Sequence, residues 1–295
     1  QKTAQTHVCR LIGVCIIAAR KTNHDNTTAA PAAGARRTAR PAGPARATSR
    51  LSDWDIMPEF AITLARWAAW APGLESAEQW ARWSGDAAPA TGNPPALEWL
   101  PAMQRRRLAP LARGVFQVAR QAAGDLAGSV PTVLASTHGE LSRTIGLLED
   151  IADGEPLSPA AFSLSVHNAV SGQLSIALGN RAPASSVALA GDGLGAALLE
   201  AHCLASPPQP VLVVLYEAPL PHQYHRYYKS DPFPWALALL LGERGQRYTL
   251  TSAPGSRPQL AQGPRLARFL ARGEADLTLA GERSDWHWSH HARPE

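Results

Sequence analysis

The chain has 295 residues, 45% hydrophobic and 18% charged, a composition typical of a globular protein with a buried core. The formal net charge is +4, but residues 1–50 hold nine Lys or Arg and one acid, which leaves 19 basic and 23 acidic side chains for the remainder. A mildly acidic body lacks the broad basic face that binds phosphates. We therefore expect no nucleic-acid partner.

Cysteine content and hydropathy argue against further classes of protein. Cys9, Cys15 and Cys203 are too few for a disulfide framework and too widely spaced for a zinc knuckle. No apolar run approaches the ~20 residues of a membrane-spanning helix, although Leu11–Ala19 resembles the core of a signal peptide. We expect a cytoplasmic protein in a reducing compartment, without a membrane span.

The N-terminal extension, residues 1–54, is expected to lie outside the fold. From Asn23 to Arg50 it consists almost wholly of Ala, Pro, Gly, Thr and Arg, and such a segment cannot offset its ordering entropy. The first methionine is Met57, so we expect the natural protein to begin near it. A targeting peptide is the alternative. Residues 55–295 are expected to form one domain.

Helical and strand-like patterns alternate along this body. Residues Glu59–Arg66 alternate in polarity, which predicts a strand, and Met103–Ala123 has the apolar spacing of one amphipathic helix. The further predicted strands are 129–136, 185–190, 211–216, then the antiparallel strands 234–241 and 247–252, and a short strand at Trp286 and Trp288. The further predicted helices are 141–152, a segment ending at Leu178, 194–204 and 263–272. Alternation followed by adjacent strands predicts a layered α/β fold with a mixed sheet.

One strand–turn–helix unit has two interpretations. Gly191-x-Gly193-x-x-Ala196 follows an apolar strand, and Glu217 ends the next strand. This is the arrangement of a dinucleotide site, in which the acid bonds to the ribose hydroxyls. The alternative function is accordingly that of a dinucleotide-binding oxidoreductase, although three small residues are a weak motif in a chain rich in Ala and Gly.

The second interpretation depends on the preceding segment. In β-ketoacyl synthases a motif N-x-x-x-G-x-x-(S/T)-I leads to a G-x-R-G-P turn and a strand that delivers the nucleophilic Cys at the start of a buried helix. The matching residues here are Asn168, Gly172, Ser175, Ile176, Arg181, Pro183 and the strand Val187–Ala190. The Cys position falls on Gly191. The segment therefore resembles the N-terminal half of the β-ketoacyl synthases.

Three further stretches, Trp67–Gly73, Ser163–Ala169 and Val211–Pro221, resemble the ketosynthase-like chain length factors of aryl polyene biosynthesis. The similarity covers about residues 59–291. It implies a thiolase-like half domain that pairs with a catalytic ketosynthase as a heterodimer. It also implies fatty-acid-like polyketide substrates on an acyl carrier protein, which the partner would bind.

The departures from the family pattern argue against catalysis. A condensing enzyme needs a thiolate and a pair of basic residues, but Gly191 has no side chain. Cys203 lies twelve residues later, about three helical turns away, which is too far to replace it. The chain after Gly191 is also too short for the second half that carries the histidines in ketosynthases. We expect Asp192 to cap a helix, and an active acyltransferase with an unidentified nucleophile is the remaining alternative.

The candidate site is therefore a pocket or an interface. Its candidate residues are Phe162, His167, Asn168 and Gly172, because the related segment of ketosynthases lies near the dimer interface. We expect no cofactor and no metal. Two histidine groups, His222 with His225 and the trio His287, His290 and His291, have spacings that a metal could use but no nearby acid or Cys.

Overall fold

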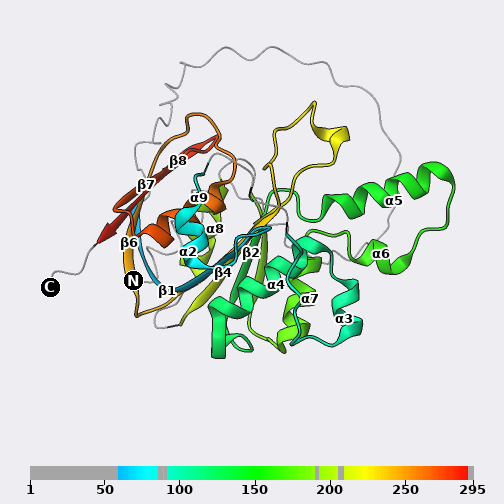
Figure 1. Cartoon of the computed structure of the whole chain (residues 1–295), viewed down its shortest axis with the longest axis horizontal. Helices are drawn as coiled ribbons and strands as arrows, with labels where there is room; N and C mark the ends of the chain where they lie inside the picture. The colour runs from blue at the N-terminus through cyan, green and yellow to red at the C-terminus, as the bar shows by residue number, and fades with distance from the viewer. Residues whose placement is uncertain (1–58, 86–88, 90–91, 190–192, 205–208, 292–295) are drawn as a thin grey trace, which may run out of the picture. The chain divides into compact units, whose positions relative to one another are not determined.

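The computed structural model describes residues 59–85, 89, 92–189, 193–204 and 209–291 (Figure 1). The chain divides into two compact units, 1–56 and 57–295, and the described residues all belong to the second. The expectations for residues 1–54, Gly191 and Asp192 concern residues outside this part of the chain.

Within the described residues, eight strands form one mixed sheet in the order β3-β2-β4-β5-β1-β6-β8-β7. Strands β3, β2 and β4 are parallel, and all the other neighbours are antiparallel. The strands are β1 (Glu59–Trp70), β2 (Thr132–Ser136), β3 (Ala184–Ala188), β4 (Val211–Glu217), β5 (Trp235–Leu241), β6 (Gln246–Pro254), β7 (Asp276–Leu279) and β8 (Ser284–His291). The expected α/β class with a mixed sheet is confirmed.

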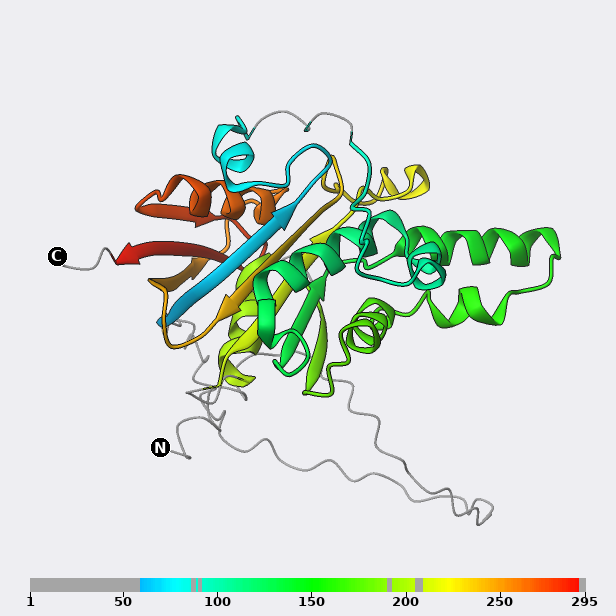
Figure 2. The ribbon, with the colours of Figure 1, turned by 60° about the horizontal axis from the view of Figure 1, so that its bottom comes forward.

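Helices cover both faces of this sheet (Figure 2). The described helices are α2 (Ala77–Arg82), α3 (Ala102–Arg107), α4 (Pro110–Ala123), α5 (Leu141–Asp153), α6 (Pro159–Ser163), α7 (Ala169–Leu178), α8 (Gly193–Leu204), α9 (Gln262–Arg272) and the 3₁₀ turns η2 (Gly124–Leu126) and η3 (His222–Tyr224). Helices α4 and α7 share one core with Leu212 and Val214 of β4. Helices α8 and α9 pack on the opposite face, where Gly263 of α9 abuts the Trp235 ring. None of the described helices is long and apolar enough to span a bilayer.

Strand β1 comes first in the chain but lies in the sheet between β5 and β6, which come much later. Strand β5 pairs with the C-terminal half of β1, and β6 pairs with its N-terminal half. The connection crosses β1 near Leu64, where Gly245 has φ +148° and a Cβ on it would lie 2.0 Å from the Leu64 carbonyl oxygen. The strands predicted at 234–241 and 247–252 are present as β5 and β6, but they run in the same direction on either side of β1. The expected antiparallel pair was wrong, because each is antiparallel to β1 instead.

Two element boundaries differ from expectation, and one strand was not predicted. The helix expected over 103–123 is broken into α3 and α4, because Pro110 disfavours helical geometry in the residue before it. Strand β1 continues past Arg66 to Trp70. Strand β7, which no pattern indicated, pairs with β8.

Helices α5 and α6 project from the sheet on the side away from β7 (Figures 1 and 2). Residues 151–160, which join and flank them, are all exposed. We call residues 141–163 the α5–α6 arm. Its exposed apolar side chains are Leu148, Ile151, Leu157 and Phe162.

Candidate functional site

Strand β3 forms an open edge of the sheet. Its register joins it to β2 on one side, and no strand within the described residues pairs with its other side. The sequence Ala-Ser-Ser-Val-Ala contains no charge and no proline, which are the usual protections of an exposed edge. The backbone of β3 is therefore free to pair with a strand from another chain.

Helix α7 leads into this edge strand and presents an open apolar surface. Ile176 is 77% exposed. One turn earlier, Gly172 is exposed, and a Cβ placed on it would meet nothing within 4 Å. Phe162 of α6 is 61% exposed, and Val166 just beyond it is 49% exposed. Of the predicted interface residues, Phe162 and Gly172 thus lie on an uncovered surface.

The other two predicted residues lie in the turn before α7. Asn168 occupies the N-cap position of α7 without a side-chain capping bond and is exposed. His167 is half-buried, and its Nε2 donates to the Ser136 carbonyl oxygen at 2.9 Å. His167 therefore joins the end of β2 and does not point freely into a pocket.

Glu217, at the C-terminal end of β4, is engaged by the protein itself. Its Oε1 accepts from the Thr137 N–H, and its Oε2 accepts from the Ser136 hydroxyl at 3.3 Å. Burial is the main reason that its pKa rises to about 7, and the nearby Asp231 charge adds to the rise. Both carboxylate oxygens of Glu217 thus have protein donors, and its interpretation as a ribose-binding acid stays a prediction.

The start of α8 is closed by residues from later in the chain. The Leu194 N–H donates to Gln262 Oε1 at 3.2 Å, and the Gln262 amide group donates to the Ala280 carbonyl at 2.9 Å. Behind this turn, a Cβ placed on Gly195 would lie 2.0 Å from Trp286 Nε1. The first described turn of α8 thus has a protein acceptor and no room for a larger side chain at 195.

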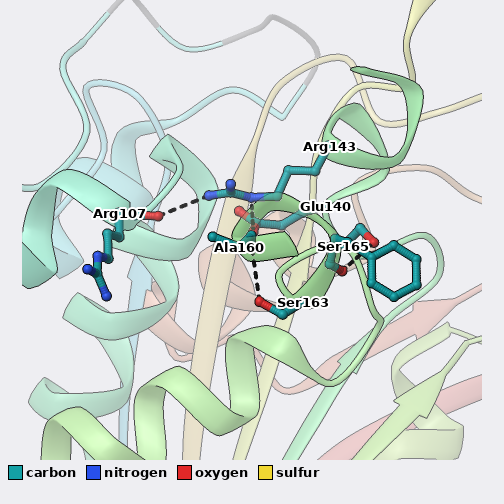
Figure 3. A network of polar contacts seen from close by, with 7 residues as sticks. Arg107, Glu140, Arg143, Ala160, Ser163 and Ser165 are labelled. Carbon is teal, nitrogen blue, oxygen red and sulfur yellow. Dashed lines mark hydrogen bonds and ion pairs between the residues drawn. The ribbon is translucent and has the colours of Figure 1, made fainter. Parts of the chain in front are cut away.

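The arm is braced to the body beside this site (Figure 3). Arg143 pairs with Glu140 at 2.9 Å and donates to the Arg107 carbonyl of α3 at 3.1 Å. Burial raises the pKa of Glu140, while Arg143 opposes the shift. On the other helix of the arm, the Ser163 hydroxyl donates to the Ala160 carbonyl at 2.9 Å.

The remaining titratable candidates are occupied by structural contacts. Cys203 lies in the last turn of α8 and is partly buried. His225 Nε2 donates to the Leu220 carbonyl at 2.7 Å, His287 bonds to Thr278 at 3.0 Å, and His291 bonds to Thr249 at 2.6 Å. No three potential metal ligands converge among the residues that the structure describes.

Comparison with known protein families shows which family this chain belongs to. The family described as "Beta-ketoacyl synthase, N-terminal domain" matches residues 80–289, which is most of the chain. The chain belongs to the β-ketoacyl synthase N-terminal domain family. The family that the motifs around Asn168 and Gly172 indicated is therefore confirmed. No curated protein matches this ketosynthase-family chain in sequence.

Solved structures support the same fold. A ketosynthase (ApeO) in complex with its chain length factor (ApeC) from Xenorhabdus doucetiae contains a chain that is 29% identical, with a TM-score of 0.69; the match covers 78% of this chain and 99% of that one. A type II polyketide synthase complex of an acyl-carrier protein with its ketosynthase (AntDE:AntF) matches at 11% identity and a TM-score of 0.54, covering 79% and 99%. The second likeness shows the fold alone.

Two parts of the site were missed at the sequence level. Ser136 is the last residue of the fully buried strand β2 and Thr137 follows it, and polar residues at the end of such a strand are a signal that could have been followed. Gln262 and Trp286 had no such signal, because their contacts with α8 span 68 and 91 positions of sequence.

Proposed function

We propose that this chain is the non-catalytic partner of a β-ketoacyl-ACP synthase, in the manner of a chain length factor. The catalytic subunit would hold the acyl chain on its own Cys and bind the acyl carrier protein. This chain would complete the heterodimer and help to shape the pocket in which an aryl polyene or a related fatty-acid-like polyketide grows.

The observation that carries this proposal is the open edge of β3. An uncharged, unpaired edge strand is an aggregation hazard unless another chain covers it. The exposed Ile176 and Phe162 and the open surface at Gly172 lie on the segments that precede this strand. A solved relative of this chain occurs in a complex of a ketosynthase with its chain length factor, which supports a partner of that kind.

The lack of catalysis is supported by the chemistry around α8. Gly191 offers no nucleophile, and condensation requires a thiolate. The Leu194 N–H, in the first described turn of α8, already donates to Gln262, so this donor is not available to a developing oxyanion. Cys203 sits at the far end of the same helix.

Phe162 is the residue proposed to act on the product. An exposed phenylalanine on the arm can project into a partner and form the end wall of an acyl pocket. Phe162→Ala would remove that wall and should shift the products of the assembled enzyme to longer chains. Leu148→Ala, on the same arm and 51% exposed, serves as the matched control.

The test is co-expression of the full tagged chain with a ketosynthase that carries its own Cys and His pair. We expect a complex of fixed 1:1 ratio, in which acyl groups from a carrier protein are found only on the ketosynthase subunit. Acylation of this chain, or turnover of malonyl-carrier protein by this chain alone, would show that it is an acyltransferase. NAD(P) binding that is lost on Gly193→Val would instead establish the dinucleotide alternative.

A further inference from the structure

The turn from Ser136 to Gly139 is where the α5–α6 arm leaves the sheet. It follows the buried strand β2 and leads directly into α5. The Gly139 N–H donates to the Ser136 hydroxyl oxygen at 2.8 Å, which closes the turn. Thr137 Oγ1 donates to the Leu189 carbonyl at 3.2 Å, and the Leu189 N–H donates to the Ser136 carbonyl at 3.3 Å. The turn is therefore hydrogen-bonded to Leu189, the residue that follows β3.

The same turn also receives the other end of the arm. After α6 the chain returns to the body through His167, whose Nε2 donates to the Ser136 carbonyl. One residue, Ser136, is thus bonded to Gly139 just before the arm and to His167 just after it. Between these points, two side-chain hydrogen bonds join the arm to described residues of the body: Arg143 donates to the Arg107 carbonyl, and Gln223 donates to Glu149 at 3.4 Å.

Glu217 anchors this turn to the sheet. It comes from β4, the neighbour of β2, and accepts from the backbone of Thr137 and from the hydroxyl of Ser136. The Thr137 N–H needs only an acceptor oxygen at this position, and an uncharged side chain can supply it as well. Removing the acceptor would leave a donor without a partner at the root of the arm.

We propose that Glu217 is a positioning residue: through the Ser136–Gly139 turn it fixes the angle at which the α5–α6 arm presents Phe162 to the partner subunit. This inference rests on the proposed function for the partner, but the order of the arm can be measured on this chain alone. Glu217 would thereby set both the geometry of the interface and the register of the segment after β3.

Asp231 provides a matched control: its charge lies close enough to raise the pKa of Glu217, but its own hydrogen bonds go to residues outside the Ser136–Gly139 turn and the α5–α6 arm. It is also a buried carboxylate that accepts two bonds, one from the Trp235 indole and one from the Ala261 N–H at 2.7 Å. Burial raises its pKa as well. Neither of its hydrogen-bond partners touches the arm. Loss of Asp231 should therefore destabilise the chain as a whole without a specific effect on residues 141–163.

The experiment compares Glu217→Ala, Glu217→Gln and Asp231→Ala by hydrogen–deuterium exchange on the full chain. We expect Glu217→Ala to speed exchange in α5 by about tenfold or more beyond its change elsewhere. Glu217→Gln, whose amide oxygen still accepts from Thr137, should restore protection to within about threefold of the wild type. Asp231→Ala should raise exchange evenly.

Binding to the ketosynthase gives the second readout. We expect affinity to fall at least about tenfold for Glu217→Ala and to recover for Glu217→Gln. Equal exchange changes in the Glu217→Ala and Asp231→Ala proteins would overturn the positioning role. A wild-type chain that binds no ketosynthase, but whose arm still loosens on Glu217→Ala, would overturn the proposed function and leave the positioning of the arm established.

Discussion

The side-chain oxygen of Gln262 lies 3.2 Å from the backbone nitrogen of Leu194 and accepts its N–H. This contact joins α9 to the start of α8, which in the β-ketoacyl synthases begins at the nucleophile. The Gln262 amide group also reaches the Ala280 carbonyl. Residues from the last third of the chain therefore hold the first described turn of α8 in place.

Gln262→Ala tests the strength of that contact. Leu194 is buried, so the variant leaves its N–H without a partner, and we expect the free energy of unfolding to fall by about 1–3 kcal/mol. Urea denaturation measures the change. Gln121→Ala, on an exposed position of α4, should change stability by less than about 0.5 kcal/mol. An equally small effect at Gln262 would mean that water replaces the amide oxygen at no cost.

Ile176→Asp tests the interface. Because Ile176 is 77% exposed, its replacement should leave the stability of the isolated chain within about 0.5 kcal/mol of the wild type. If the partner covers this residue, a buried unpaired charge should weaken the complex by at least about 2 kcal/mol, as measured by titration calorimetry. Met103→Asp on α3, where Met103 is 71% exposed, is the matched control. Unchanged affinity in the Ile176 variant would place the interface elsewhere.

Gly245→Ala tests the crossing of β1. The backbone conformation at Gly245 is one that side chains rarely adopt, and the added Cβ would collide with the Leu64 carbonyl. We expect a loss of roughly 2–4 kcal/mol in the free energy of unfolding. The opposite result is expected for Gly146→Ala in α5, where the new Cβ meets nothing within 4 Å, since alanine favours a helix by about 0.5–1 kcal/mol. Circular dichroism melts should separate the two variants in opposite directions.

The pH dependence of stability tests the ionisation of Glu217. Burial raises its pKa from 4.5 to about 7, so the folded chain holds a proton that the unfolded chain releases near pH 4.5. The contribution of Glu217 to stability is complete below pH 4.5 and is lost as the pH rises toward 7. The loss is at most about 3 kcal/mol.

Glu217→Gln cannot titrate, so its free energy of unfolding should decline less than that of the wild type between pH 5 and pH 8. Glu140 and His138 also titrate, but they are common to both proteins and cancel in the difference. Asp231 interacts with the Glu217 charge, so the difference reports the two carboxyl groups together. Parallel stability curves for the two proteins, measured by urea denaturation at each pH, would show that Glu217 stays ionised.

Local patterns predicted the elements well and their arrangement less well. Strands β4 and β5 are continuous apolar runs, and α9 has apolar residues at helical spacing. These patterns lie within each element, so the sequence of the element alone predicts it. The pairing of β1 with both β5 and β6 depends on residues 166 to 192 positions apart. No pattern within one segment contains that information.

The candidate site shows the same division. Phe162 and Gly172 were found from family motifs within one segment, and both proved exposed. Glu217 was considered as a ribose-binding acid in one of the two interpretations because it ends a strand; in the structure it accepts from Thr137 and Ser136. A carboxylate at the end of a strand has the same sequence pattern in both cases. Only the neighbouring strand decides which partner it meets.

The central place of β1 has a consequence for biosynthesis. This strand is made early, but its two neighbours end only at Leu241 and Pro254. During synthesis β1 must therefore remain unpaired, in the nascent chain, until nearly all of the domain has left the ribosome. The parallel strands β3, β2 and β4 lie closer in sequence and can associate sooner. Such long-range pairing slows folding, so the antiparallel half of the sheet should form after the parallel half, and β1 stays accessible to chaperones in the interval.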